Sequence, residues 1–211
     1  MKRIDELIER FPNLREVSDK IEKTYAILEE LYYNENRKIL LVGNGGSAAD
    51  CDHIVGELMK GFKRKRPISE TDCKKLETVD HELGLQLSKK LQGALPCISL
   101  ANHSALNTAF INDVDGKMFF AQQVYAYGNM GDALICLSTS GNSENILYAA
   151  VTAKAKGVKV ISITGKTGGK LCKLSDVCIN IPEEETYKIQ EMTVPIYHCL
   201  CLMLEDCFFK F

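Results

Sequence analysis

Two side chains that could carry protons or bind a metal ion lie four residues apart in the first third of the chain. His53 and Glu57 occupy positions i and i+4, which share one face of an α-helix. An imidazole and a carboxylate so placed suit proton transfer or metal binding, although such pairs are also common on solvated helix faces. A second histidine, His198, lies eight residues after Gln190 in an apolar stretch, where a histidine is more often a buried packing residue.

Two short polar runs have the composition of an anion-binding site. Residues 43–46 (GNGG) follow a run rich in Ile, Leu and Val, and Ser47 comes next. Glycines allow a tight turn that directs several backbone N–H groups at one anion, and Ser47 adds a hydroxyl. Residues 138–143 (STSGNS) have the same placement before a predicted helix. One such run could serve only to cap a helix, but two of them predict a shared phosphate site.

The elements that must position these residues alternate between strand and helix. Apolar runs predict strands at 38–42, 95–100, 133–137, 159–163 and 177–181, and helical patterns fall between most of them, notably at 117–127 and 144–156, before a long closing helix at 187–209. This alternation predicts an α/β fold in three layers, with a doubly wound, five-stranded parallel sheet in the middle. Ligands of such folds lie beyond the carboxyl ends of the strands.

Two segments lie outside the alternating pattern. The N-terminal segment 1–36 contains predicted helices at 3–10 and 15–34, and the second carries an apolar stripe that should pack against the domain or against a second copy. Segment 61–93 contains a predicted helix at 83–91 and adjoins the basic run 60–66. That run could contact nucleic acid, but we interpret it as a solvated loop or an anion clamp at the mouth of the site.

The composition is that of an ordinary globular protein. A chain of 211 residues suits one domain, 1–211, and a net charge of −2 gives no reason to expect nucleic acid or an anionic membrane as a partner. No apolar run approaches the roughly twenty residues of a membrane span. The nine cysteines are scattered and no secretory signal is recognisable, so we expect reduced thiols and a cytoplasmic location.

A nucleotide cofactor is not expected. Gly43, Gly45 and Ala48 match the GxGxxA pattern of dinucleotide-binding turns. That fold also needs an acidic residue at the end of a second strand about twenty residues later. The chain has its basic run there instead.

Together these motifs resemble the sugar isomerase (SIS) domain family, and within it they are most similar to the phosphoheptose isomerases. The resemblance rests on GNGGS followed by His53 and Glu57, on STSGNS, and on ETYKIQE with His198 eight residues after its glutamine. It covers nearly the whole chain and implies a flavodoxin-like SIS fold. It also implies an aldose–ketose isomerase that converts sedoheptulose 7-phosphate into D-glycero-D-manno-heptose 7-phosphate through an enediol.

The resemblance gives an expected role to each matching position. Glu57 and His198 match the family's acid/base pair, and the ligands of its zinc site match His53, Glu57, Gln190 and His198. The positions that hold the phosphosugar match Asn44, Gly45, Gly46, Ser47, Asn102, Ser138, Thr139, Ser140, Ser143 and Gln190. Asn102 departs from the aspartate usual in the family, and whether zinc acts in catalysis or only organises the site is open. The family is a homotetramer in which the leading and closing helices form a central bundle and neighbouring subunits complete each site.

Two other functions remain open on the sequence. One SIS protein acts in replication initiation by holding a partner protein, and other members isomerise different phosphosugars. The four residues that match the zinc site favour an enzyme, because a binding scaffold has no use for them.

Overall fold

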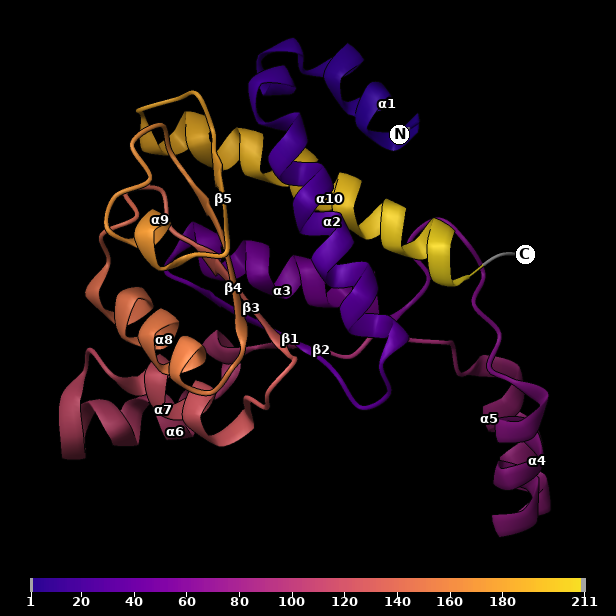
Figure 1. The fold of residues 1–211 in the computed structure, drawn as a ribbon. Helices are drawn as coiled ribbons and strands as arrows, with labels where there is room; N and C mark the ends of the chain where they lie inside the picture. The colour runs from indigo at the N-terminus through magenta and orange to yellow at the C-terminus, as the bar shows by residue number, and fades with distance from the viewer. Residues whose placement is uncertain (1, 210–211) are drawn as a thin grey trace.

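The structure, a computed structural model, describes residues 2–209 of the chain. Its centre is a parallel sheet with the strand order β2-β1-β3-β4-β5 (Figure 1). The strands are β1 (Ile39–Gly43), β2 (Cys97–Ser99), β3 (Ala133–Leu137), β4 (Lys159–Thr164) and β5 (Val177–Asn180). The prediction of a doubly wound, five-stranded parallel sheet is confirmed. Strand β2 is shorter than the predicted 95–100, because the chain turns into a 3₁₀ helix at Leu100.

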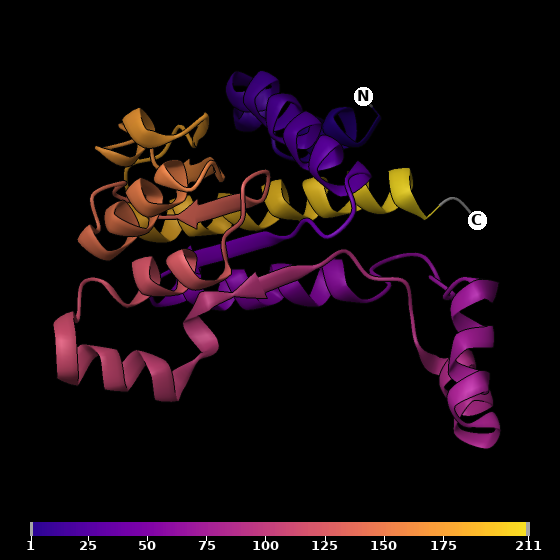
Figure 2. The same cartoon turned by 60° about the horizontal axis from the view of Figure 1, so that its bottom comes forward.

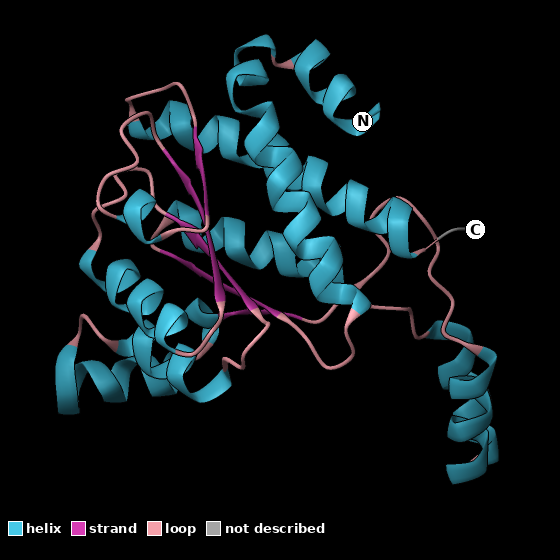
Figure 3. Cartoon of the chain, viewed as in Figure 1, coloured by secondary structure: helices cyan, strands magenta, loops and turns pink. Residues whose placement is uncertain are grey.

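Each face of the sheet is covered by its own helices (Figure 3). Helices α2 (Ser18–Tyr33), α3 (Gly46–Met59) and α10 (Thr186–Phe208) pack on the face that receives Ile39 and Leu41. Helices α7 (Phe119–Tyr127), α8 (Glu144–Ala155) and α9 (Leu171–Leu174) cover the face that receives Leu40 and Val42. Because both faces are buried, β1 and β3 are apolar at nearly every position.

The N-terminal segment begins with α1 (Lys2–Arg10) and a 3₁₀ helix (Pro12–Val17), so α2 starts three residues later than predicted. Val17, Ile21 and Leu28 of the apolar stripe are buried within the chain itself. Helix α1 lies on the outer side of α10 (Figure 1).

Between β1 and β2 the chain forms a helical hairpin where the sequence predicts one helix. Helices α4 (Glu70–Val79) and α5 (His81–Lys90) project from one end of the sheet (Figures 1 and 2). We call residues 68–91 the arm. Helix α4 was missed because it buries no residue and so shows no apolar period.

The remaining helical segment between β2 and α7 consists of α6 (Ser104–Phe110) and a π-helical turn (Ile111–Asp115). All nine cysteines are free. Within residues 2–209, no helix combines the length and apolarity needed to cross a membrane.

Candidate active site

The two predicted anion-binding loops, residues 43–47 and 138–143, lie side by side at the edge where the strand order reverses, and we call them the anion loops. Strands β1 and β3 are neighbours, and their last paired residues are Gly43 and Leu137. The side chains of Asn44 and Asn145 join the loops directly, through Nδ2–H···Oδ1 bonds of 3.0 and 2.8 Å. In a doubly wound sheet this reversal is where ligands bind. Asn145 follows the STSGNS run by two residues, and no motif marks it as part of the site.

The helix termini at these loops are open to an anion. Gly45, with φ of 56°, precedes the first residue of α3, and no side chain caps that helix. Ser143 occupies the N-cap position of α8 but makes no capping bond, and its Oγ lies 3.5 Å from Ser138 Oγ. Ser47 is buried, while Ser140 is exposed and its Oγ accepts a hydrogen bond from the N–H of Asn142. Helix capping therefore does not account for these hydroxyls, and backbone N–H groups at two helix ends face the same edge.

A third loop, residues 165–171, braces the STSGNS loop. The N–H of Gly165 donates to Thr139 O, and the N–H of Leu171 donates to Gly141 O, each at 2.9 Å. Gly141 has a φ of 62°, and a Cβ there would collide with the carbonyl of Gly168. The glycines of this third loop were a signal that the sequence reasoning did not use.

Helices α3 and α10 run side by side in the same direction, and this brings two pairs of candidate residues together. The Gln190 amide packs against Gly46, where a Cβ would lie 2.7 Å from Nε2. Farther along both helices, the rings of His53 and His198 meet edge to face with centroids 5.0 Å apart. The seven residues from Gly46 to His53 span about 10 Å at 1.5 Å per residue. Gln190 therefore lies at the anion loops, whereas His198 lies at His53.

His53 is held by hydrogen bonds at both ring nitrogens. Its Nε2 lies 3.1 Å from Glu57 Oε1, and its Nδ1 lies 2.9 Å from the hydroxyl of Tyr197. The Tyr197 hydroxyl also donates to Asp50 Oδ1 at 3.3 Å. Burial and the charge of Asp50 raise the pKa of Tyr197, so its hydroxyl stays protonated. The sequence reasoning missed Tyr197 and Asp50, although Asp50 precedes His53 by one helical turn.

His198 lies on the wall of a cavity and not in a sealed core. The cavity, of about 700 Å³, separates α1 from α10 and is also lined by Arg3, Arg10 and Glu191. Burial and the neighbouring His53 lower the pKa of His198, so the imidazole is neutral at pH 7. Its Nε2 is buried without a hydrogen-bond partner.

The residues partly fit the zinc site that the resemblance implies. Two imidazoles and one carboxylate are a common zinc donor set. Both His198 Nε2 and Glu57 Oε2 are buried without a hydrogen-bond partner, and Glu57 Oε2 has only the Lys60 Nζ at 3.8 Å as an ionic neighbour, so a metal would give His198 Nε2 the partner that it lacks. Across the described part of the chain, however, no three His, Cys, Asp or Glu side chains are gathered closely enough to hold an ion. Gln190, the fourth expected ligand, lies at Gly46 and not with the other three.

Asn102 lies just beyond β2, and its Nδ2 donates to Asp52 Oδ1 on α3 at 2.7 Å. This bond fixes the loop after β2 against the helix that carries His53. The uncharged amide thus has a partner within the chain, although it remains exposed.

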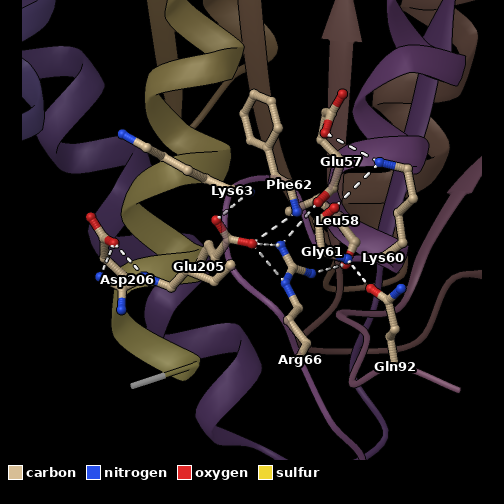
Figure 4. A network of polar contacts seen from close by, with 11 residues as sticks. Glu57, Leu58, Lys60, Gly61, Phe62, Lys63, Arg66, Gln92, Glu205 and Asp206 are labelled. Atoms are coloured by element: carbon tan, nitrogen blue, oxygen red, sulfur yellow. Dashed lines mark hydrogen bonds and ion pairs between the residues drawn. The ribbon is translucent and has the colours of Figure 1, made fainter. Parts of the chain in front are cut away.

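A buried ion pair ties the end of α3 to α10 (Figure 4). Arg66, only 1% exposed, donates from Nε to Glu205 Oε1 at 2.9 Å and from its terminal nitrogens to the carbonyls of Leu58 and Glu57 at 2.8 and 3.1 Å. Glu205 also accepts the N–H groups of Phe62 and Lys63. The interpretation of the basic run as a solvated loop or anion clamp is wrong for Arg66, because the guanidinium of Arg66 is buried and paired with Glu205.

Comparison with known proteins agrees with this architecture. The family model of the SIS domain matches residues 95–203. The chain is 38% identical over 190 residues to a phosphoheptose isomerase of Aneurinibacillus thermoaerophilus, an alignment that covers 90% of this chain and 82% of that protein. A phosphoheptose isomerase of Thermodesulfovibrio yellowstonii is 39% identical over 177 residues, which cover 84% of this chain and 75% of that protein.

Solved structures give the same result. A phosphoheptose isomerase from Francisella tularensis superposes with a TM-score of 0.74 at 28% identity, covering 96% of this chain and 94% of that one. The enzyme from Neisseria gonorrhoeae superposes with a TM-score of 0.70, also at 28% identity, over 97% of this chain and 91% of that one.

Proposed function

This chain belongs to the phosphoheptose isomerase family of SIS domain proteins, and we propose that it interconverts sedoheptulose 7-phosphate and D-glycero-D-manno-heptose 7-phosphate. The observation that carries the proposal is the meeting of His198 with His53, beside Glu57, about 10 Å along α3 from the anion loops. His53 and His198 are 145 positions apart in the chain. The imidazole and carboxylate groups of this cluster are those that proton transfer between carbon and oxygen requires.

The phosphate group binds at the two loops in this proposal. Ser47, Ser138, Thr139, Ser140 and Ser143 surround it with hydroxyls, and the amino ends of α3 and α8 contribute N–H groups and favourable dipoles. Gly45 has open space where a Cβ would lie, and Gly46 makes room for the Gln190 amide. In this proposal Asn44 and Gln190 contact the sugar between the phosphate and the histidines. Asn102 binds a sugar hydroxyl from the side of β2.

The distance between the two parts of the site suits an open-chain heptose. Seven bonds of about 1.5 Å, arranged as a zigzag, span roughly 9 Å from the phosphorus to C2. This length is close to the 10 Å or so along α3 from the anion loops to His53. A phosphate held at the loops therefore brings the carbonyl end of the sugar to Glu57 and His198.

The isomerisation moves two protons. The Glu57 carboxylate takes the proton from C1 of the ketose while the carbonyl oxygen at C2 gains one, which yields the 1,2-enediol. Neutral His198 can give the proton of its ring N–H to O2 and take the proton of O1 back on the same nitrogen. Return of the first proton from Glu57 to C2 completes the aldose. Both directions use the same groups, and no proton is gained or lost.

Zinc is part of the proposal. His53, Glu57 and His198 would hold the ion, whereas Gln190 packs against Gly46 and stays at the anion loops. A bound zinc ion would supply positive charge to stabilise the developing enediolate. The hydrogen bond between Glu57 and His53 restricts the rotation of the Glu57 side chain. The hydrogen bond between His53 and Tyr197 restricts the rotation of the His53 ring.

We also propose that the protein is a cytoplasmic homotetramer. Its copies would meet along α1, α2 and α10, where the cavity beside His198 opens between α1 and α10. A neighbouring copy on this surface would exclude water from His198. The free cysteines are consistent with a reducing compartment.

The proposal is tested by incubating the purified protein with sedoheptulose 7-phosphate in D₂O and following the sugar by NMR. We expect the anomeric signals of the aldose, together with deuterium introduced at the exchanged carbon. Turnover of a different phosphosugar, with none of the heptose, would assign another substrate to the same site. Absence of turnover on any phosphosugar would support the non-enzymatic alternative, in which the loops only bind.

A further inference from the structure

The two helices of the arm pack against each other and have few contacts with the rest of the protein. They meet at Gly84, where a Cβ would lie 2.6 Å from backbone atoms of Leu76 and Glu77. At the root of the arm, the N–H of Gly93 donates to Arg66 O at 2.6 Å. Beyond this root the arm extends away from the sheet and its helices (Figures 1 and 2).

The arm exposes large apolar side chains. Val79 is 88% exposed, Leu83 59% and Leu87 41%. None of them contributes to either core. Val79 ends α4, and Leu83 and Leu87 belong to α5. Exposed apolar side chains gathered on one projecting hairpin point to a surface that another molecule covers.

One face of α5 carries charged and apolar side chains in an order that is complementary to the same face of a second, antiparallel copy. Leu83, Leu87 and Lys90 follow one another at i, i+4 and i+7 on a single face of α5, and the extended N-cap residue Asp80 stands three residues before Leu83 at the start of that face. All four are exposed. Reading the face from either end gives a charge, two leucines and a charge of the opposite sign. Asp80 accepts the N–H of Leu83 through Oδ1, which leaves its other oxygen for an outside partner.

We propose that this face, defined by Asp80, Leu83, Leu87 and Lys90, pairs with the same face of a second copy of the chain. A two-fold axis passing between Leu83 and Leu87 places each Leu83 against the partner's Leu87. The same axis places each Asp80 against the partner's Lys90, so two ion pairs flank four leucines. The two helices then run antiparallel, which also opposes their dipoles favourably.

A second copy fits the charges better than an unrelated protein does. An unrelated partner would need only a matching surface and would impose no symmetry on α5. The order acid, leucine, leucine, base is what an isologous contact requires. The contact adds a second kind of interface to the homotetramer proposed above, but it does not rest on the isomerase activity.

Zero-length cross-linking tests the contact directly. A carbodiimide condenses a carboxylate and an amine in contact into an amide, with loss of water. Asp80 and Lys90 of one helix lie about 15 Å apart along the axis, so they can react only between two chains. We expect a species of twice the chain mass that contains the Asp80–Lys90 amide. The Asp72–Lys75 pair, 3.2 Å apart in one chain, is the internal positive control.

Formation of the Asp72–Lys75 amide without any Asp80–Lys90 amide would overturn the proposal. The double variant Leu83→Lys/Leu87→Lys should lose the inter-chain product by at least tenfold. Leu85→Lys, on the opposite side of α5, is the matched control and should keep it. Circular dichroism of each variant confirms that the helices remain.

Exchanging the charges of Asp80 and Lys90 distinguishes a specific contact from nonspecific association. Asp80→Lys and Lys90→Asp each place like charges opposite each other, and each should weaken self-association by about tenfold in sedimentation velocity. The double variant Asp80→Lys/Lys90→Asp restores opposite charges across the axis and should recover it. Asp80→Asn, which keeps an N-cap acceptor and removes only the charge, is the matched variant and should weaken self-association less than Asp80→Lys. Failure of the double variant to recover, with its helix content unchanged by circular dichroism, would count against the two-fold pairing. Both experiments use the protein alone, so failure of the isomerase assay leaves their results unaffected.

Discussion

Asn44 and Asn145, 101 positions apart, exchange two side-chain hydrogen bonds across the loops that follow β1 and β3. This amide pair sets the spacing of the proposed phosphate site. Asn145→Ala should therefore raise the KM for the phosphosugar severalfold with a smaller effect on kcat, because the loops lose a tie of about 1–2 kcal/mol. Steady-state kinetics checks this, with the exposed Asn112→Ala as control. A fall in kcat with KM unchanged would point to a different role.

Glu57→Gln should lower kcat by at least about 100-fold, the loss typical of removing a general base. The fold and phosphate binding should persist, because the amide has nearly the same shape. Inorganic phosphate titrated into the variant measures the binding separately from turnover. Glu30→Gln, on the exposed side of α2, is the matched control. Near-normal turnover in the Glu57 variant would contradict the assigned role.

Zinc content should follow the cluster of His53, Glu57 and His198. We expect about one zinc per chain in the purified protein, measured by inductively coupled plasma mass spectrometry, and loss of activity with a strong chelator. His198→Ala should reduce the bound zinc, whereas His81→Ala, on the arm, should not. Equal zinc content in the unmodified protein, His198→Ala and His81→Ala would show that the zinc does not bind at His198.

Removing one partner of the buried Arg66–Glu205 pair should destabilise the protein more than replacing both partners with apolar residues. Arg66→Met leaves Glu205 buried and unpaired, so it should reduce the free energy of unfolding by about 3–5 kcal/mol. The double variant Arg66→Met/Glu205→Leu should recover much of that loss. Urea unfolding followed by circular dichroism measures both variants. Equal stability of the single and double variants would contradict the cost assigned here to a buried Glu205 without Arg66.

Acid should weaken the protein partly through Glu205. Burial alone raises the pKa of this carboxyl, but the N–H groups of Lys63 and Phe62 and the Arg66 guanidinium outweigh burial and lower the pKa below its ordinary value. The unfolded state then binds a proton more readily than the folded state. The contribution to stability is complete above about pH 4.5 and is lost as the pH falls through the lower, folded pKa. Glu205→Gln should be less stable at pH 7 and show a flatter decline between pH 5 and 3.

The sheet could be predicted because its residues repeat a local pattern. Strands β1 and β3 are buried on both faces and stand out as continuous apolar runs between glycine-rich turns. Helix α4 could not be found in this way, because it lies outside the core and buries nothing. Its local signal is the N-cap at Ser69, whose Oγ accepts the N–H of Asp72.

The candidate site was predictable only in part. The anion loops follow from local composition, but the meeting of His53 with His198 was expected only from the family resemblance. The roles of Tyr197 and Arg66 depend on partners more than 130 positions away, namely His53 and Glu205. Local patterns do not record such pairings. The position of Gln190 beside Gly46 likewise depends on how two parallel helices are aligned.

The root of the arm is a point at which a segment of the chain could be inserted or deleted. Pro67 and Gln92 form an antiparallel bridge, so the segment leaves the domain and returns at almost the same point. Neither helix of the arm contributes to the two cores. If the arm were removed, the two chain ends left at Pro67 and Gln92 would already lie side by side. A short turn in place of residues 68–91 should leave the sheet intact, and a foreign domain could be grafted at the same point. The junction is thus a place where evolution or an engineer can exchange one module for another without redesigning the enzyme.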